Sequence, residues 1–204
     1  MKSSRRGLRR RKPRQRRSRQ TVEAILDAVV RILKREGFDS VTTNRIAEVA
    51  GVSIGSLYQY FPDKKAIFVA LHARHLEHID RVIQSTLVEH ASSRLDTLLG
   101  AMVDAMIEAH LDDPELYELL ATEVPHGADG AKHFAERLHS VFRLALASRA
   151  QELKESRDLD SLTFVVAHMV ESLCHGALSR RPPGMSLRDA KAEIVRALMA
   201  YLRA

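Results

Sequence analysis

The chain has 204 residues, of which 28 % are charged, 5 % are aromatic and none is tryptophan. This composition, dominated by Ala, Leu, Glu and Arg, favours an all-α protein, and no apolar run approaches the roughly 20 residues that cross a bilayer. The single cysteine, Cys174, excludes an internal disulfide and is typical of a reducing cytoplasm, where we expect the protein to act.

The net charge of +6 comes from one end of the chain. Residues 1–20 hold eleven basic residues and no acid, and removing these from the 32 Lys and Arg leaves 21 against 26 acidic residues, a net −5. A block of like charge with nothing to bury is expected to be a disordered arm that binds polyanions. It lacks the apolar segment of a transit or signal peptide. The alternative is a solvated charge run without a ligand.

Four helices are predicted in the next part of the chain. In residues 21–36, apolar residues recur at helical spacing until Gly37 ends the helix as a left-handed cap. Thr42 caps a second, barely two turns long, that ends at Gly51. A third runs from a Ser53 cap to about Tyr60, and a fourth begins near residue 64 after a cap from Asp63.

The remainder is predicted to be longer helices over residues 64–88, 93–111, 114–123, 130–155, 160–179 and 187–203, with a capping box of Ser186 and Asp189 opening the last. We therefore expect three parts. These are a disordered basic arm over residues 1–20, a three-helix domain over 21–66 and a larger helical domain over 67–204.

The stretch AGVSIGSLYQYFP at residues 50–62 is poorly equipped to bury itself. Leu57 and Phe61, four residues apart, are suited to one buried side, and the other side chains are polar or small. Two short helices joined by a tight glycine turn are the geometry of a helix-turn-helix, whose second helix lies in the major groove of DNA. Gly55 would let the DNA backbone come close to this helix.

The residue types on this segment suit DNA. The hydroxyls of Thr43, Ser53, Tyr58 and Tyr60 and the ammonium of Lys64 suit phosphate oxygens. Gln59 suits an adenine edge, and Ile54 suits a thymine methyl. The competing interpretations are that Tyr58 and Tyr60 are packed aromatics, that Ile54 is partly buried and that Lys64 is an ordinary surface lysine.

The segment TTNRIAEVAGVSIGSLYQYFPDKKAIF resembles the DNA-binding segment of the tetracycline-repressor (TetR) family of bacterial transcription regulators, over about 45 residues. The resemblance implies an all-α fold of about nine helices and a cytoplasmic homodimer that reads a near-palindromic operator. It also implies a small-molecule effector, bound among the C-terminal helices, that releases a repressor from DNA. Thr43, Tyr58, Tyr60 and Lys64 match the family's phosphate contacts; the positions near bases are Asn44, Ile54, Gly55, Ser56 and Gln59.

The penultimate predicted helix is apolar on more than one face, which suggests that it packs on a partner as well as on its own core. In the family, the last two helices form the dimer interface. We therefore expect interface residues among Leu162, Val165, Val166, Met169, Val170, Leu173, Ile194, Leu198 and Tyr201.

Other functions have weaker support. Phosphate-loop, dinucleotide, nucleophile-elbow and zinc-hydrolase motifs are absent, so we expect no enzyme and no cofactor. His72, His75 and His78 spread over too wide an arc of a helix for one metal site, so we expect no bound metal. A metal-responsive switch stays an alternative. His168 and His175, which lie seven residues apart, would belong to it. Further alternatives are an architectural DNA-binding protein, an activator and a regulator without an effector. Candidates for an effector pocket, or for ordinary core packing, are Met102, Met106, His110, Phe134, Phe142 and Met169.

Overall fold

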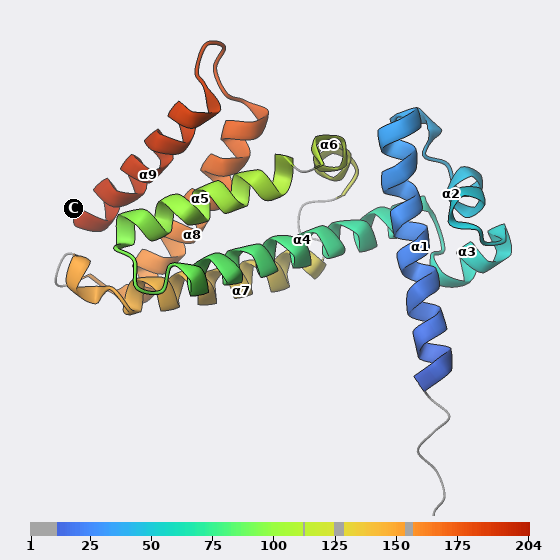
Figure 1. Cartoon of the computed structure of the whole chain (residues 1–204), viewed down its shortest axis with the longest axis horizontal. Helices are drawn as coiled ribbons and strands as arrows, with labels where there is room; N and C mark the ends of the chain where they lie inside the picture. The colour runs from blue at the N-terminus through green and yellow to red at the C-terminus, as the bar shows by residue number, and fades with distance from the viewer. Residues whose placement is uncertain (1–11, 112, 125–128, 154–156) are drawn as a thin grey trace, which may run out of the picture. The chain divides into compact units, whose positions relative to one another are not determined.

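The computed structural model describes residues 12–111, 113–124, 129–153 and 157–204, and all its regular elements there are helical. Figure 1 shows them in chain order. They are α1 (Lys12–Glu36), η1 (Phe38–Ser40), α2 (Thr43–Ala50), α3 (Ile54–Tyr60), α4 (Lys64–Glu89), α5 (Leu95–Leu111), α6 (Pro114–Glu123), α7 (Asp129–Ala147), η2 (Ala150–Glu152), α8 (Leu159–Ser179) and α9 (Leu187–Arg203). The predicted all-α class is confirmed.

The chain forms two compact units. The N-terminal unit holds the described residues up to Leu71 together with Glu115–Val124, and the C-terminal unit holds His72–Pro114 and the described residues from Asp129 onward. The boundary lies inside α4, a few residues beyond the predicted one at residue 66. A single helix is thus shared by the two units.

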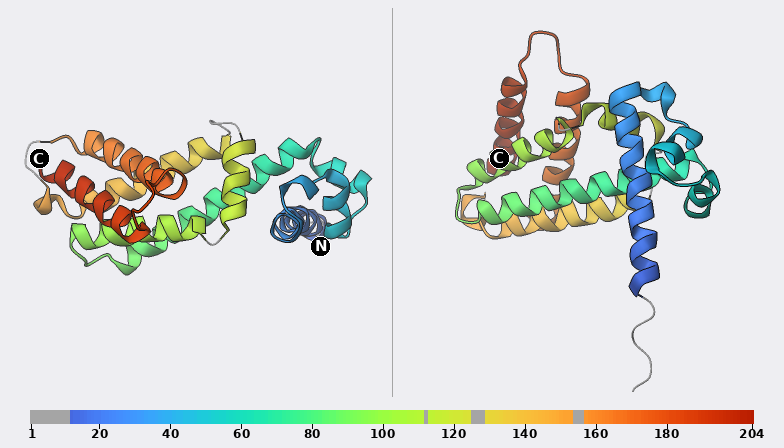
Figure 2. Two further views of the ribbon diagram at one scale, coloured as in Figure 1. Left: turned by 90° about the horizontal axis from the view of Figure 1, so that it is seen from above. Right: turned by 45° about the vertical axis from the view of Figure 1, so that its right-hand side comes forward.

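The N-terminal unit is built on α1, against which α2 packs, while α3 packs on α2 (Figure 2). Apolar residues of α1, α2, α3, the start of α4 and the segment before α2 are buried, because none of the short helices could bury a face alone. The buried set is Ile25, Leu26, Ala28, Val29, Ile32, Leu33, Val41, Ile46, Ala47, Leu57, Phe61, Ile67, Phe68 and Leu71.

The start of α1 corrects one prediction. We expected a disordered arm through residue 20, but α1 already begins at Lys12, so residues 12–20 are helical. Arg, Lys and Gln are good helix formers, and adding turns to an existing helix avoids the cost of a nucleus. Arg16, Arg17 and Arg19 are exposed on this extension. The rest of the predicted arm, residues 1–11, lies outside the described residues.

The C-terminal unit packs α5 against α8 and α9, and α8 also against α7. Its core draws on α4, α5, α7, α8 and α9 and includes Met102, Met106, Phe134 and Phe142. These four predicted effector-pocket candidates are buried, in agreement with the core-packing alternative.

Arg149, two residues after the end of α7, is only 4 % exposed and holds two chain segments together. Its guanidinium donates hydrogen bonds to the backbone oxygens of His90 (2.8 Å), Ala91 (2.9 Å) and Ser93 (2.9 Å) in the turn after α4. It also donates to the oxygen of Ala145 at 3.3 Å. The positive charge therefore lies at the carbonyl ends of both α4 and α7, where the helix dipoles favour a cation.

Among the described residues, α8 is the one helix long and apolar enough to cross a membrane by length and composition alone, which the sequence analysis did not anticipate. A core helix passes the same test. Val166, Val170 and Cys174 are buried in the core of the C-terminal unit, and burial raises the pKa of the Cys174 thiol to about 12. The apolar character of α8 is therefore explained by packing.

The structure divides the predicted interface residues by their exposure. Leu162, Val166, Val170, Ile194 and Leu198 are buried in the core of their own unit, so they are not available to a second subunit. Periodicity showed that α8 has two apolar sides, but not which side the chain's own core uses. Val165, Met169 and Tyr201 are half-buried and Leu173 is exposed, so these remain available. The sequence analysis missed Phe164, which is 56 % exposed.

Candidate nucleic-acid interface

The turn between α2 and α3 forms as the sequence predicts. The Thr42 hydroxyl accepts from the backbone N–H of Arg45 at 3.2 Å and caps α2. Gly51 ends that helix with φ 68° and ψ 32°, the left-handed conformation that glycine adopts without strain. The Ser53 hydroxyl then accepts from the N–H of Ser56 at 3.0 Å and caps α3. The predicted left-handed cap at Gly37 differs, because its φ is 80° but its ψ is 176°.

The two sides of α3 differ in exposure. Leu57 is fully buried and Phe61, directly after the helix, is 6 % exposed. Of the remaining large side chains of α3, Ile54 is 40 %, Tyr58 is 48 % and Tyr60 is 36 % exposed. The alternative in which both tyrosines are packed inside is therefore not supported, whereas Ile54, at 40 % exposed, still agrees with the alternative that it is partly buried. An apolar and two aromatic side chains held in solvent on a short helix indicate a surface that meets a partner.

Gly55 lies on this exposed side, and the fold does not require a glycine there. Its φ is not positive, and a Cβ atom at this position would meet nothing closer than Ser53 Oγ at 4.0 Å. Glycine inside a helix costs roughly 0.5–1 kcal/mol relative to alanine. A glycine that the free protein does not need suits the close approach of another molecule.

Hydroxyl groups surround the exposed side of α3. Thr43 Oγ1 and the Tyr58 hydroxyl lie 3.2 Å apart, which links the start of α2 to α3. Ser53 Oγ and Ser56 Oγ lie 2.8 Å apart. Asn44 and Gln59 are exposed. Ser53 is also the cap of α3, so its hydroxyl already has a structural role beside the one predicted from sequence.

Lys64, the first residue of α4, has a defined position. Its Nζ lies 5.6 Å from the ring centroid of Phe38 and 5.4 Å from that of Phe68. Such contacts attract a cation to the face of an aromatic ring. They hold the ammonium near the surface of the N-terminal unit, where Phe38 is 42 % exposed. The sequence analysis did not predict this contact of Phe38. The one sign of it in the sequence is that an aromatic residue directly follows Gly37.

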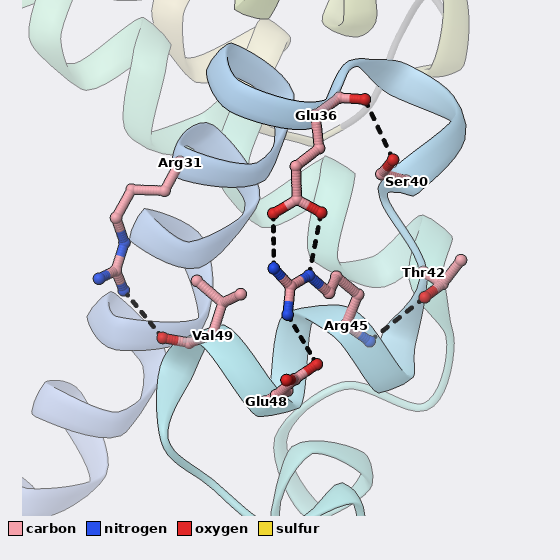
Figure 3. A network of polar contacts seen from close by, with 7 residues as sticks. All are labelled: Arg31, Glu36, Ser40, Thr42, Arg45, Glu48 and Val49. Carbon is pink, nitrogen blue, oxygen red and sulfur yellow. Dashed lines mark hydrogen bonds and ion pairs between the residues drawn. The ribbon is translucent and has the colours of Figure 1, made fainter.

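A polar network fixes α2 on α1 (Figure 3). Arg45 donates to both carboxylate oxygens of Glu36, from Nε at 3.0 Å and from Nη2 at 2.7 Å, and its Nη1 lies 2.7 Å from Glu48 Oε2. Hydrogen bonds and charge from the two carboxylates raise the pKa of Arg45, and the bond from Arg45 lowers the pKa of Glu36. Arg31 of α1 adds a bond to the backbone oxygen of Val49 at 3.2 Å.

This network positions the candidate interface without belonging to it. Glu36 is the last residue of α1, and Arg45 lies in the first turn of α2, beside Thr43 and Asn44. No local pattern identifies the pairing, because the two residues are nine positions apart and on different helices. The predicted DNA-contact residues of α2 are thereby held at a fixed place on α1.

The histidines do not form a metal centre among the described residues, where no group of three or more metal-ligating side chains is found. His75 instead faces His110 of α5, with ring centroids 5.2 Å apart. His168 packs on Phe164 on the exposed part of α8, with ring centroids 4.2 Å apart. The metal-responsive alternative therefore gains no support from these residues.

Both units resemble proteins that are already known. Residues 25–71 match the model of bacterial regulatory proteins of the tetR family, and residues 94–202 match that of the tetracyclin repressor-like C-terminal domain. The chain is 30 % identical over 169 residues to the nucleoid occlusion factor SlmA of Haemophilus influenzae, covering 78 % of this chain and 73 % of that protein. It is 28 % identical over 125 residues to the transcriptional repressor KstR of Mycolicibacterium smegmatis, covering 60 % and 61 %.

A solved structure shares the fold over nearly the whole chain. The fatty acid degradation regulator FadR of Bacillus halodurans superposes with a TM-score of 0.64 at 18 % identity, covering 89 % of this chain and 99 % of that one. The helix-turn-helix and the helical C-terminal unit thus occur together in a known fold. The chain belongs to the tetR family of bacterial regulatory proteins, and it is a DNA-binding transcriptional regulator.

Proposed function

We propose that the protein is a homodimeric repressor whose α3 enters the major groove of a near-palindromic operator and whose C-terminal unit binds a small molecule that releases it. The observation that carries this proposal is the exposed side of α3, with Ile54, Tyr58 and Tyr60 in solvent and open space at Gly55. A helix-turn-helix places that side against base edges. The similarity to the transcriptional repressor KstR supports repression, as opposed to activation, of the regulated genes.

The residues divide by chemistry. Thr43, Tyr58, Tyr60 and Lys64 supply hydroxyl and ammonium donors for phosphate oxygens, which position the protein on DNA. Asn44, Ile54, Gly55, Ser56 and Gln59 lie on or beside the exposed side of α3 and are assigned to the bases. Ser53 caps α3 and reaches phosphate in addition. The Thr43–Tyr58 contact holds two of the phosphate donors together.

A competition assay tests sequence-specific binding. At moderate salt, the protein should bind the genomic fragment that it selects roughly 10³-fold more tightly than random DNA. Equal affinity for both would favour the architectural alternative, in which the basic charge supplies affinity without regard to sequence.

The basic end of the chain is expected to add affinity that depends on salt. Deleting residues 2–11 removes Lys2 and five arginines and leaves α1 intact. Each phosphate contact contributes about −0.9 to the slope of log K against log salt, so the slope should become less steep by about 2–5. Replacing the exposed Arg180 and Arg188 by glutamine is the matched control and should leave the slope unchanged. An unchanged slope in the deletion variant would rule out this segment as a phosphate ligand.

Dimerisation is assigned to the side of α8 that faces away from its own core. Phe164 is exposed there, packed on His168, with the half-buried Val165 beside them. Phe164→Glu should convert the dimer to a monomer in analytical ultracentrifugation. It should also weaken operator binding at least tenfold, because a monomer contacts only one half-site of the operator. Leu144→Glu, on the exposed side of α7, is the control. A Phe164→Glu protein that remains dimeric would move the interface elsewhere.

A second candidate function comes from the SlmA relative, named a nucleoid occlusion factor. Under that alternative the protein binds DNA as a nucleoid occlusion factor and not as a repressor of particular genes. Mapping its bound sites in the cell separates the two: a regulator occupies few sites beside promoters, and an occlusion factor occupies many sites without regard to promoters.

A further inference from the structure

Phe38 is an aromatic side chain that a defined turn holds partly in solvent. It is the first residue of η1, and it is 42 % exposed. Gly37, directly before it, has φ 80° and ψ 176°, a conformation that is essentially limited to glycine and persists only where the surrounding structure requires it. The N–H of the buried Val41 donates to the Phe38 oxygen at 3.0 Å and closes the turn. The position of Phe38 is therefore fixed, although burial does not account for its ring.

The ring of Phe38 faces the ammonium of Lys64. Lys64 Nζ lies 5.6 Å from the centroid of the Phe38 ring and 5.4 Å from that of Phe68, both within the distance at which an aromatic ring attracts a cation. Phe68 follows Lys64 by one helical turn on α4 and is only 1 % exposed, so the core fixes it. Phe38 comes from a different element and supplies the second, exposed ring.

Other groups near the start of α4 do not hold a cation there. The N-terminus of a helix carries partial positive charge and favours anions. Even so, α4 begins with Lys64 and Lys65 and has no acidic residue in its first turn. The neighbouring Asp63 carboxylate accepts from the N–H of Ala66 at 2.7 Å, and within the described part of the chain no carboxylate pairs with Lys64. The two rings are thus the contacts that draw this ammonium to its place.

A lysine held by rings differs from a lysine held by an acid. A carboxylate would order the side chain, but it would also neutralise the ammonium and compete with a phosphate for its N–H donors. An aromatic ring attracts the ammonium without carrying a net charge, so the charge of Lys64 stays available. A side chain that is already ordered loses less rotamer freedom when it binds. Lys64 is therefore prepared for an anion, whereas the exposed Lys65 is not.

We infer that Phe38 is a positioning residue for DNA, whose ring, together with that of Phe68, holds the Lys64 ammonium ready for one phosphate of the operator backbone. This inference rests on the proposed function, which assigns Lys64 to phosphate. Phe38 acts through Lys64 and not by its own contact with DNA. Apolar packing does not require an aromatic ring at residue 38, but attraction of a cation does, and this difference can be tested.

The contact itself is measured on the full chain without DNA. Protons above the face of an aromatic ring resonate upfield in NMR spectra. The Cε protons of Lys64, assigned by their loss in Lys64→Gln, should therefore lie upfield of those of Lys65. Phe38→Leu should move the Lys64 signals downfield and leave the Lys65 signals in place. Lys64 signals that do not move would overturn the inference.

The consequence is measured with a DNA duplex that carries the sequence enriched by the protein from a random pool. Phe38→Leu keeps an apolar side chain without the ring, and it should bind this duplex about fivefold more weakly. Phe38→Met should behave in the same way and replaces it if leucine disturbs folding. Phe38→Tyr keeps the ring and should restore the affinity to within about twofold. A tyrosine variant as weak as the leucine variant would contradict the role of the ring.

A double-mutant cycle shows whether Phe38 acts through Lys64. In a Lys64→Gln background, Phe38→Leu should cause no further loss of affinity, because no ammonium is left to position. In a Lys65→Gln background, which removes the same charge from the neighbouring residue, the loss of about fivefold should persist. An equal loss from Phe38→Leu in both backgrounds would overturn the inference.

The inference and the proposed function can be distinguished in the same experiment. If Lys64→Gln alone bound the duplex as tightly as the unmodified protein, the phosphate contact in the proposed function would be wrong, and the inference would fail with it. If Lys64→Gln weakened binding but Phe38→Leu did not, the inference alone would be refuted.

Discussion

Replacing Gly55 by glutamate is expected to weaken operator binding more than 100-fold while the protein stays folded. The carboxylate would stand on the exposed side of α3, where phosphates and base edges approach, and a 100-fold loss corresponds to about 3 kcal/mol. The free protein has room for the side chain, since the nearest atom to a Cβ is Ser53 Oγ at 4.0 Å. Glutamate also favours a helix over glycine by roughly 0.5–1 kcal/mol.

Two measurements belong together for this variant: a DNA titration at fixed salt and an unfolding curve. Gly55→Ala should show a smaller loss of affinity, about tenfold, with the same gain in stability. Gln84→Glu, an equal change of charge at an exposed position of α4, is the control and should bind as the unmodified protein does. If Gly55→Glu kept its affinity within threefold, α3 would not be the reading helix.

Arg149→Met should destabilise the protein by about 3 kcal/mol, the largest single effect that we expect on stability. The change leaves the carbonyls of His90, Ala91 and Ser93 without their donor. Each buried acceptor that is left unpaired costs about 1–3 kcal/mol. Water that enters the site and donates hydrogen bonds to these carbonyls recovers part of this cost. In a chain of this size, the midpoint of thermal unfolding should fall by roughly 6–12 °C.

The matched control for this prediction is Arg143→Met on α7. Arg143 Nε lies 2.7 Å from Asp160 Oδ1, but both side chains are largely exposed, and such pairs contribute at most about 1 kcal/mol. Similar midpoints for the two variants would show that the buried hydrogen bonds of Arg149 do not stabilise the turn after α4.

The local parts of the fold could be predicted because local chemistry determines them. Thr42, Ser53 and Asp63 cap the helices that they were expected to cap; the Asp63 carboxylate accepts from the N–H of Ala66 at 2.7 Å. Pro114 begins α6 as expected. Leu57 and Phe61 are buried as their four-residue spacing predicted. In each case the signal lies within a few residues of its effect.

The features that were missed depend on contacts between distant residues. Arg45 of α2 meets Glu36 of α1, Lys64 of α4 meets Phe38 of η1, and His75 of α4 meets His110 of α5. The apolar sides of α8 were recognised but not assigned, because which side faces the chain's own core is decided by α5, α7 and α9. The DNA roles of the residues on α3 stay predictions, supported by their exposure.

The most direct test of the central claim is to sequence the DNA that the protein selects from a random pool. A dimer that reads DNA with two copies of α3 should enrich a near-palindrome. The centres of its half-sites should lie about one turn of the DNA helix, or a multiple of one turn, apart. The Gly55→Glu protein should enrich nothing from the same pool. Selection without any common motif, or an unchanged motif from the Gly55→Glu protein, would contradict the assignment of α3 as the reading helix.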